Sequence, residues 1–110
     1  MNSDLTVGYY NTRMIEIEET SSTLSINPND YYKWINPVTL LTITLKEPTN
    51  INILNIYTIE FTTSDSGCTL MLPQTVKWMD GEAPDIEPST TYQISITNNL
   101  AIIQGFTYAQ

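Results

Sequence analysis

Apolar residues recur at every second position along several short stretches of this chain, and this alternation limits what the chain can fold into. The clearest stretch covers residues 38–45, where Leu41, Ile43 and Leu45 alternate with Thr42 and Thr44. Such alternation places apolar side chains on one face of a β-strand and polar side chains on the other. No window of helical length keeps apolar residues at i, i+3, i+4 and i+7 beyond one turn. The pattern therefore predicts an all-β fold.

Similar stretches predict further strands on both sides of this block, at residues 14–18, 23–26, 55–62, 68–72, 75–78, 91–97 and 100–108. Turn residues rich in Asn, Pro, Asp and Gly separate them. Between the last two stretches lies Asn98-Asn99, and asparagine tolerates positive φ, so we expect a two-residue hairpin turn there. Short strands with turns at this spacing favour a sandwich or a small barrel, and we expect an antiparallel β-sandwich, either jelly-roll-like or immunoglobulin-like.

The length of 110 residues fits one domain, which we place at residues 13–110. Residues 1–12 show weak periodicity and are the candidate for an N-terminal arm that docks onto a neighbouring subunit. The N-terminus has no basic region followed by an apolar run, so a signal peptide is not expected. No apolar stretch approaches the ~20 residues that span a bilayer. We therefore expect synthesis in a cytoplasm.

The excess of acidic over basic residues argues against some classes of binding partner. Four basic residues stand against twelve acidic ones, and the formal net charge is −8. Neutralising phosphates requires many Lys and Arg side chains, so nucleic acid and anionic membranes are not expected partners. The acidity is explained by solubility and mutual repulsion of free copies, or by steering toward a basic partner surface.

The sequence offers little for catalysis. Histidine is absent and Cys68 is the only cysteine, which excludes Ser-His-Asp and Cys-His arrangements and cysteine-based zinc sites. Four acidic residues lie close together in a Pro-containing stretch: Asp80, Glu82, Asp85 and Glu87. They form a solvated acidic loop, calcium ligands, or an acid–base pair for glycoside cleavage, and the first interpretation is preferred. We expect no enzyme activity, no cofactor and no metal.

Aromatic residues are the candidate interaction sites: Tyr9, Tyr10, Tyr31, Tyr32, Trp34 and Trp78. Flat rings with polar tips suit either a protein partner or the face of a sugar. The alternative is that Trp34 and Trp78 fill the core or an interface between subunits. This alternative is favoured over a sugar-stacking platform.

The second half of the chain carries a more specific pattern. It comprises Leu72-Pro73, Val76-Lys77-Trp78, Gly81-x-x-Pro84, a short acidic connection, and Thr91-Tyr92-x-x-Ser95-Ile96 before a closing hairpin strand. This pattern resembles a β-rich module of structural proteins from tailed phages and prophages, including head-fibre, capsid-decoration and tail proteins. The resemblance covers about residues 29–106. The chain departs from it at the hairpin turn, which is often Asn-Gly in such modules and is Asn98-Asn99 here.

This resemblance implies a non-enzymatic structural protein of a tailed bacteriophage, located in the virion and assembled in the host cytoplasm. In many relatives the module ends a longer chain, whereas here it is nearly the whole chain. An auxiliary capsid-decoration or head-fibre protein that binds the major capsid protein or another virion protein is therefore the expected function. Such modules usually form homo-oligomers, and a trimer is expected. The alternative is a tail-associated module that binds a receptor or a host surface glycan.

Overall fold

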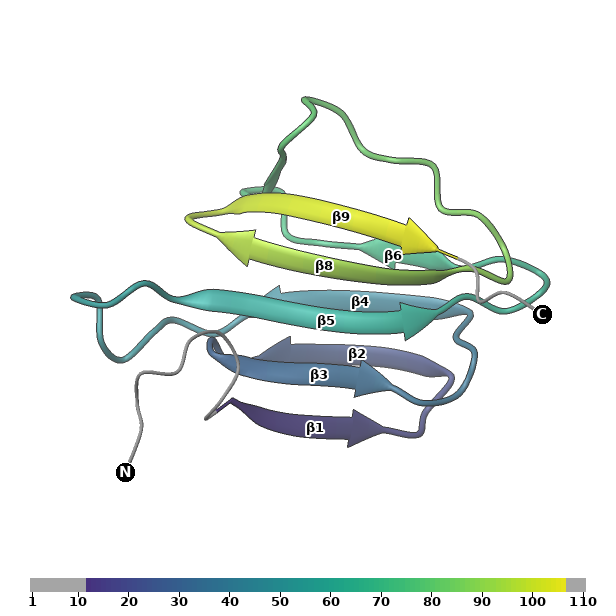
Figure 1. The fold of residues 1–110 in the computed structure, drawn as a ribbon, viewed down its shortest axis with the longest axis horizontal. Coiled ribbons are helices and arrows are strands. Elements are labelled where there is room, and N and C mark those ends of the chain that lie inside the picture. The colour runs from purple at the N-terminus through teal and green to yellow at the C-terminus, as the bar shows by residue number, and fades with distance from the viewer. Residues whose placement is uncertain (1–11, 107–110) are drawn as a thin grey trace.

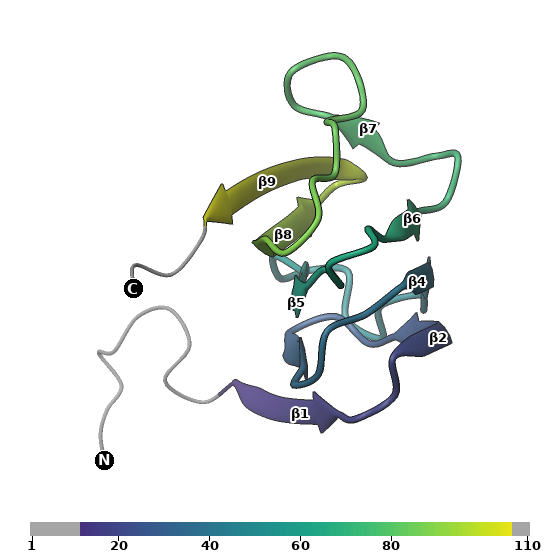
Figure 2. The same ribbon diagram turned by 90° about the vertical axis from the view of Figure 1, so that its right-hand side faces the viewer.

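Nine β-strands and no helix make up residues 12–106, the part of the chain that the computed structural model describes (Figure 1). The strands are β1 (Arg13–Ile17), β2 (Ser21–Ile26), β3 (Asp30–Trp34), β4 (Leu40–Leu45), β5 (Ile56–Thr62), β6 (Thr69–Met71), β7 (Lys77–Trp78), β8 (Thr91–Thr97) and β9 (Leu100–Phe106). They form a six-stranded sheet in the order β1-β3-β5-β8-β9-β7 and a three-stranded sheet in the order β2-β4-β6. Figure 2 shows the two sheets as two layers. The predicted arm lies outside the described residues, except for Thr12.

The prediction of an antiparallel β-sandwich is wrong. The pairs β1–β3 and β3–β5 are parallel, and the smaller sheet is parallel throughout. Within residues 12–106, antiparallel pairing between strands occurs only where β8 meets β5 and β9. The reason is that, from β1 to β6, each connection carries the chain from one sheet to the other. Every second strand therefore returns to the same sheet in the same direction, and the first six strands form a short two-sided coil.

The connections at one end of the coil explain why parallel pairing is stable. Residues 18–20, 35–39 and 63–68 are three arches that link the two sheets and lie on one another. The Thr39 amide donates to the Thr20 carbonyl at 2.8 Å, and the Ser64 amide donates to the Val38 carbonyl at 2.9 Å. The strand ladders therefore continue through the arches, and these main-chain groups have partners there.

The core consists of cross-strand rows that follow the parallel register. One row of the larger sheet crosses five strands with Ile15, Tyr32, Ile59, Ile94 and Ile103. The next inward row is aromatic at Trp34, Phe61 and Tyr92. The smaller sheet faces these rows with leucines and isoleucines, among them Leu41 and Ile43. Side chains of neighbouring strands contact one another along these rows and stabilise the pairing.

The hairpin that closes the larger sheet is confirmed. Thr97 pairs with Leu100, and the two residues between them, Asn98 and Asn99, have φ of 54° and 62°. Positive φ at both central positions is the geometry of a type I′ turn, which matches the twist of the strands on either side. Asparagine adopts this geometry at lower cost than most residues that carry a Cβ.

Candidate docking surface at one end of the two sheets

One connection is much longer than the crossing requires. β2 joins β3 through residues 27–29, whereas β4 joins β5 at the same end through residues 46–55. We name residues 46–55 the end loop. In Figure 1 it projects at the left, beside the β8–β9 turn. Loops longer than the fold needs are a frequent place for binding residues, because a rigid scaffold holds them at the surface.

The end loop exposes three large aliphatic side chains to solvent. Ile51, Ile53 and Leu54 are 81%, 52% and 63% exposed. The stretch 48–55 contains no charged residue, although the whole chain has a net charge of −8. Single exposed apolar residues are ordinary, but three within four positions on a projecting loop form a patch, and such patches mark interaction sites.

Asparagine side chains hold the end loop in a defined conformation. The Asn55 Nδ2 donates to the carbonyls of Asn50 at 2.9 Å and Ile53 at 3.2 Å, and the Asn52 amide donates to Asn50 Oδ1 at 3.0 Å. From the neighbouring short connection, Asn29 Nδ2 donates to Asn55 Oδ1 at 2.9 Å. These bonds order the loop from within. The aliphatic side chains therefore face solvent in a structured loop, as a binding surface requires.

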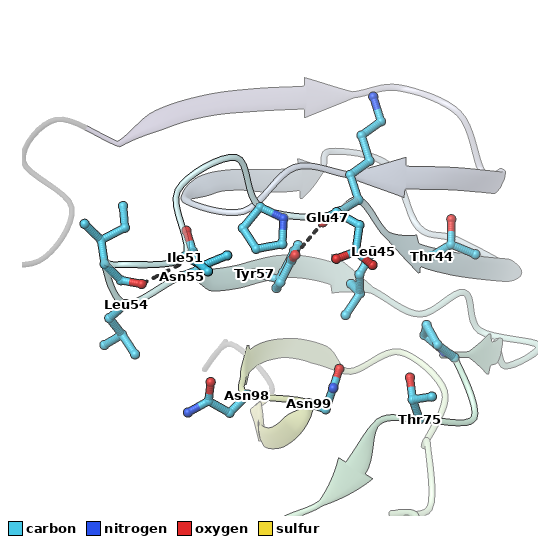
Figure 3. Close-up of a pocket in the computed structure, with 14 residues that line it drawn as sticks. Thr44, Leu45, Glu47, Ile51, Leu54, Asn55, Tyr57, Thr75, Asn98 and Asn99 are labelled. Atoms are coloured by element: carbon cyan, nitrogen blue, oxygen red, sulfur yellow. Dashed lines mark hydrogen bonds between the residues drawn. The ribbon is translucent and has the colours of Figure 1, made fainter.

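A hollow of about 590 Å³ lies beside the aliphatic side chains. Figure 3 shows residues of the end loop with Tyr57 on one side of it and Thr75, Asn98 and Asn99 on the other. Among its lining residues only Lys46 and Glu47 carry charge, and they have opposite signs. The hollow is therefore close to electrically neutral and lined by apolar and amide groups. It suits an uncharged or amphipathic protein surface.

Tyr57 supports the floor of this hollow. Its side chain is buried and its hydroxyl donates to the Lys46 carbonyl. Burial raises the pKa of Tyr57 above its usual value, and the nearby charge of Glu47 raises it further. Both effects favour the neutral phenol, so at neutral pH Tyr57 acts as a hydrogen-bond donor that fixes the start of the end loop.

The structure separates the six aromatic residues selected from the sequence. Tyr9 and Tyr10 lie outside the described residues. Tyr32 and Trp34 are only 4% and 2% exposed and belong to the core, so they offer no surface to a partner. The Trp34 Nε1 donates to Ser22 Oγ at 3.0 Å and links the two sheets. Trp34 is therefore a core residue, as the interpretation that placed it in the core predicted, and not a contact residue at the surface.

Tyr31 lies half-buried on the outer face of the larger sheet. Its hydroxyl donates to Glu60 Oε1 and accepts a hydrogen bond from Gln93 Nε2 at 2.8 Å. Lys33 Nζ lies 3.8 Å from the other carboxylate oxygen of Glu60. This polar row joins β3, β5 and β8 on the outer face, and it accounts for Tyr31 as a structural residue of the sheet.

Trp78 is half-buried and is the one predicted aromatic residue of the described part that lines hollows at the surface. It borders an apolar hollow of about 220 Å³ that also contacts Leu72 and Ile86. It also borders a hollow of about 530 Å³ that is lined by Asp80 and Asp85. Within residues 12–106, no group of three or more Asp, Glu, His or Cys side chains is placed to hold a metal ion.

No protein-family model, curated protein or solved structure matches this chain. None of the described residues belongs to a helix that is long and apolar enough to cross a membrane.

The sequence around the end loop contains residues that favour a loop, although its apolar residues also alternate as in a strand. Ile51-Asn52-Ile53 alternates like a strand, but it follows Pro48-Thr49-Asn50 and ends at Leu54-Asn55. Proline and asparagine on both sides favour a turn or loop. Aliphatic residues in such a loop have no strand neighbours to bury them, and this is what makes the segment a candidate site.

Proposed function

We propose that this chain is a non-enzymatic structural protein of a tailed bacteriophage virion, an auxiliary capsid-decoration or head-fibre protein that docks onto a virion shell protein through its end loop. The observation that carries the docking step is the exposure of Ile51, Ile53 and Leu54 on an ordered loop whose residues 48–55 carry no charge. The virion setting rests on the resemblance of residues 29–106 to modules of phage structural proteins.

The charge distribution supports a protein partner. Free copies repel one another through their net negative charge, while the end loop, whose two charged residues Lys46 and Glu47 have opposite signs, meets a partner without that repulsion. Burying aliphatic side chains stabilises a contact by about 25 cal/mol for each Å² of apolar surface removed from water. Three clustered side chains therefore form the energetic centre of the contact, and polar groups such as Asn98 and Asn99 form its rim. Attachment in symmetric copies, with a trimer as the preferred arrangement, is part of this proposal.

The test is reconstitution on genome-packaged particles that lack the protein. Cryo-EM of particles mixed with the wild-type chain should show regular, high occupancy over the shell. The variant Ile51→Asn/Leu54→Asn should lose this density, because it removes the apolar contact. Ile35→Asn is the matched control, since Ile35 is also exposed but lies in the arch at residues 35–39. Equal occupancy for all three proteins would refute docking through the end loop, and density only at the tail would refute a shell role.

A second candidate function is supported by Trp78. A tail-associated module that binds a host glycan requires an accessible aromatic ring beside polar groups, and Trp78 borders a hollow with Asp80 and Asp85. Glycan-array binding that is lost in Trp78→Leu and retained in Ile51→Asn would favour this function over shell attachment.

A further inference from the structure

The six-stranded sheet ends in an incomplete edge. β7 pairs with β9 only over Lys77–Leu100 and Trp78–Ala101. The chain then leaves the sheet, while β9 continues to Phe106. The edge of β9 from Ile102 onward has no neighbouring strand among the described residues. Such an edge is a template for pairing with another chain.

The hydrogen bonds of β7 show which β9 groups face this edge. The carbonyls of Asn99 and Ala101 accept bonds from the Lys77 and Met79 amides at 2.7 and 2.8 Å. Main-chain groups of a strand alternate in direction, so the amides and carbonyls of Ile103 and Gly105 point the same way as those of Ala101. No described residue bonds to them on that side.

A groove runs along the same edge. Its volume is about 530 Å³, and it is lined by residues 101–104 of β9 on one side and by residues of the segment 78–85 on the other. The opposite wall is held at both ends. At one end the Met79 amide donates to the Ala101 carbonyl at 2.8 Å, and just beyond the other end the Glu87 amide donates to the Tyr92 hydroxyl at 2.7 Å. The groove is therefore a defined surface between two anchored walls.

At this edge of the core, no described strand covers the side chain of Ile103. In the inward row of the larger sheet Ile94 is fully buried, but Ile103 of β9 is only half-buried. A further strand would place an apolar side chain beside Ile103. The adjoining apolar hollow of about 220 Å³ shares Trp78, Ala83 and Pro84 with the groove and extends this apolar side.

The negative charge of the groove indicates which kind of peptide binds there. Its ionisable lining residues are Asp80, Glu82 and Asp85, and it contains no Lys or Arg. The chain's own terminal segments, residues 1–11 and 107–110, contain no basic residue either. These segments therefore do not complement the charge of the groove, whereas a basic segment of a partner protein does.

We propose that the groove between β9 and residues 78–85 binds an extended peptide segment of a partner protein, in which basic and apolar residues alternate, as an added β-strand. The segment pairs with the main chain of Ile103 and Gly105 and takes the position that β7 leaves vacant after Trp78. Its apolar side chains cover Ile103, and its basic side chains face Asp80 and Asp85. This mode of recognition is β-strand addition, in which main-chain bonds supply affinity and alternate side chains supply specificity.

The probe for this site is the peptide acetyl-(Lys-Val)₃-amide, titrated into isotope-labelled protein and followed by NMR. Saturable shifts should appear at residues 101–105, with hydrogen exchange at the Ile103 and Gly105 amides slowed about tenfold. The same peptide with glutamate in place of lysine should bind at least about tenfold more weakly. Absence of shifts at this edge, or equal binding of the glutamate peptide, would overturn the proposal.

Two N-methylated peptides test the main-chain pairing without changing the protein. In an added strand either all lysine amides or all valine amides face β9, because main-chain directions alternate. Methylation of one set should abolish binding, and methylation of the other set should leave it intact. If both methylated peptides bind like the parent peptide, the contact is a charge contact alone and strand addition is refuted.

Two protein variants test the charge selection with the same change in net charge. Asp80→Asn/Asp85→Asn should weaken binding of the lysine peptide about tenfold, whereas Glu16→Gln/Glu18→Gln should not change it. Ile51→Asn should also bind the peptide normally, which separates this site from docking through the end loop. Binding of an oligosaccharide at Trp78, together with no shifts at residues 101–105 on addition of the peptide, would assign the groove to the glycan class and overturn the proposal.

Discussion

Gly105 lies directly against the ring of Tyr92, so closely that a Cβ atom on Gly105 would lie 2.5 Å from Tyr92 Cε1. The two residues face each other across β8 and β9. Tyr92 cannot move aside easily. Its ring packs on Phe61 with centroids 5.7 Å apart, and its hydroxyl accepts a hydrogen bond from the Glu87 amide. The ring therefore covers the glycine, and the two positions form one packing unit.

Gly105→Ala should destabilise the domain by about 1–3 kcal/mol, because the added methyl group overlaps the ring. The intrinsic preference has the opposite sign, since alanine favours a strand interior over glycine by about 0.5–1 kcal/mol. Urea denaturation measures the difference, with exposed Gln104→Ala as the control. In a Tyr92→Leu background the cost of Gly105→Ala should shrink, and an unchanged cost would contradict the overlap.

The hydrogen bond between Trp34 Nε1 and Ser22 Oγ joins the two sheets through the core. Ser22→Ala should leave the buried indole N–H without a partner and cost about 1–3 kcal/mol of unfolding free energy. Ser21→Ala is the matched control on the exposed neighbour of the same strand and should change stability by less than about 0.5 kcal/mol. Chemical denaturation of the two variants decides this. Equal stabilities would show that the bond contributes nothing.

The alternation of apolar residues predicted where most strands lie, but it could not predict which strands pair. The stretch 38–45 became β4 and the stretch 55–62 became β5, yet these two strands lie in different sheets. Alternation reports only which face of a strand is buried. A two-residue turn of type I′ joins two neighbouring strands of one sheet, and in this sequence the residues typical of such a turn are Asn98-Asn99, between β8 and β9. Three of the other connections are the arches at residues 18–20, 35–39 and 63–68, whose hydrogen bonds depend on the arch stacked beside them.

The sequence also concealed β3, the strand between β1 and β5. Tyr31-Tyr32-Lys33-Trp34 follows a dense turn signal at residues 27–30, and its adjacent tyrosines blur the alternation. In the fold Tyr32 and Trp34 face the core, while Tyr31 and Lys33 face outward toward Glu60. Aromatic residues with polar tips serve either face. Their type alone therefore did not distinguish core residues from candidate contact residues.

The thiol of Cys68, the only cysteine of the sequence, allows the effect of burial on a pKa to be tested. Cys68 packs against the core, and burial raises its pKa above the ordinary value. Between the ordinary pKa of about 8.5 and the higher folded value, the unfolded chain loses the proton while the folded chain keeps it. The stabilising contribution of the neutral thiol is therefore complete below the ordinary pKa and is lost as the pH rises through the folded value.

In this alkaline range Cys68 of the folded protein should react with iodoacetamide more slowly than Cys68 of the urea-unfolded chain, because the thiolate is the nucleophile. Rates measured as a function of pH on the folded and unfolded chain give both titration curves. Since the sequence has one cysteine, each rate belongs to one residue. Coincident curves would contradict the effect of burial on the thiol.

The end loop gives the prediction that connects structure to docking. Asn55 uses its Nδ2 for two loop carbonyls and its Oδ1 for Asn29. Asn55→Ala removes all three bonds and should release residues 50–54, while the domain loses only about 1 kcal/mol of stability for each bond that contributed to folding. Hydrogen exchange of the loop amides should accelerate. Occupancy on virion particles should fall as well, since the loop must then be ordered upon binding.

Asn52→Ala is the matched control for this prediction. It lies in the same loop and is exposed, and its side chain makes no hydrogen bond to the described residues. It should leave loop exchange and particle binding unchanged. If both variants bind particles like the wild-type chain, order in the end loop is irrelevant to docking. If Asn55→Ala alone loses binding while its unfolding transition stays close to that of the wild-type chain, the loss originates in the loop and not in the fold.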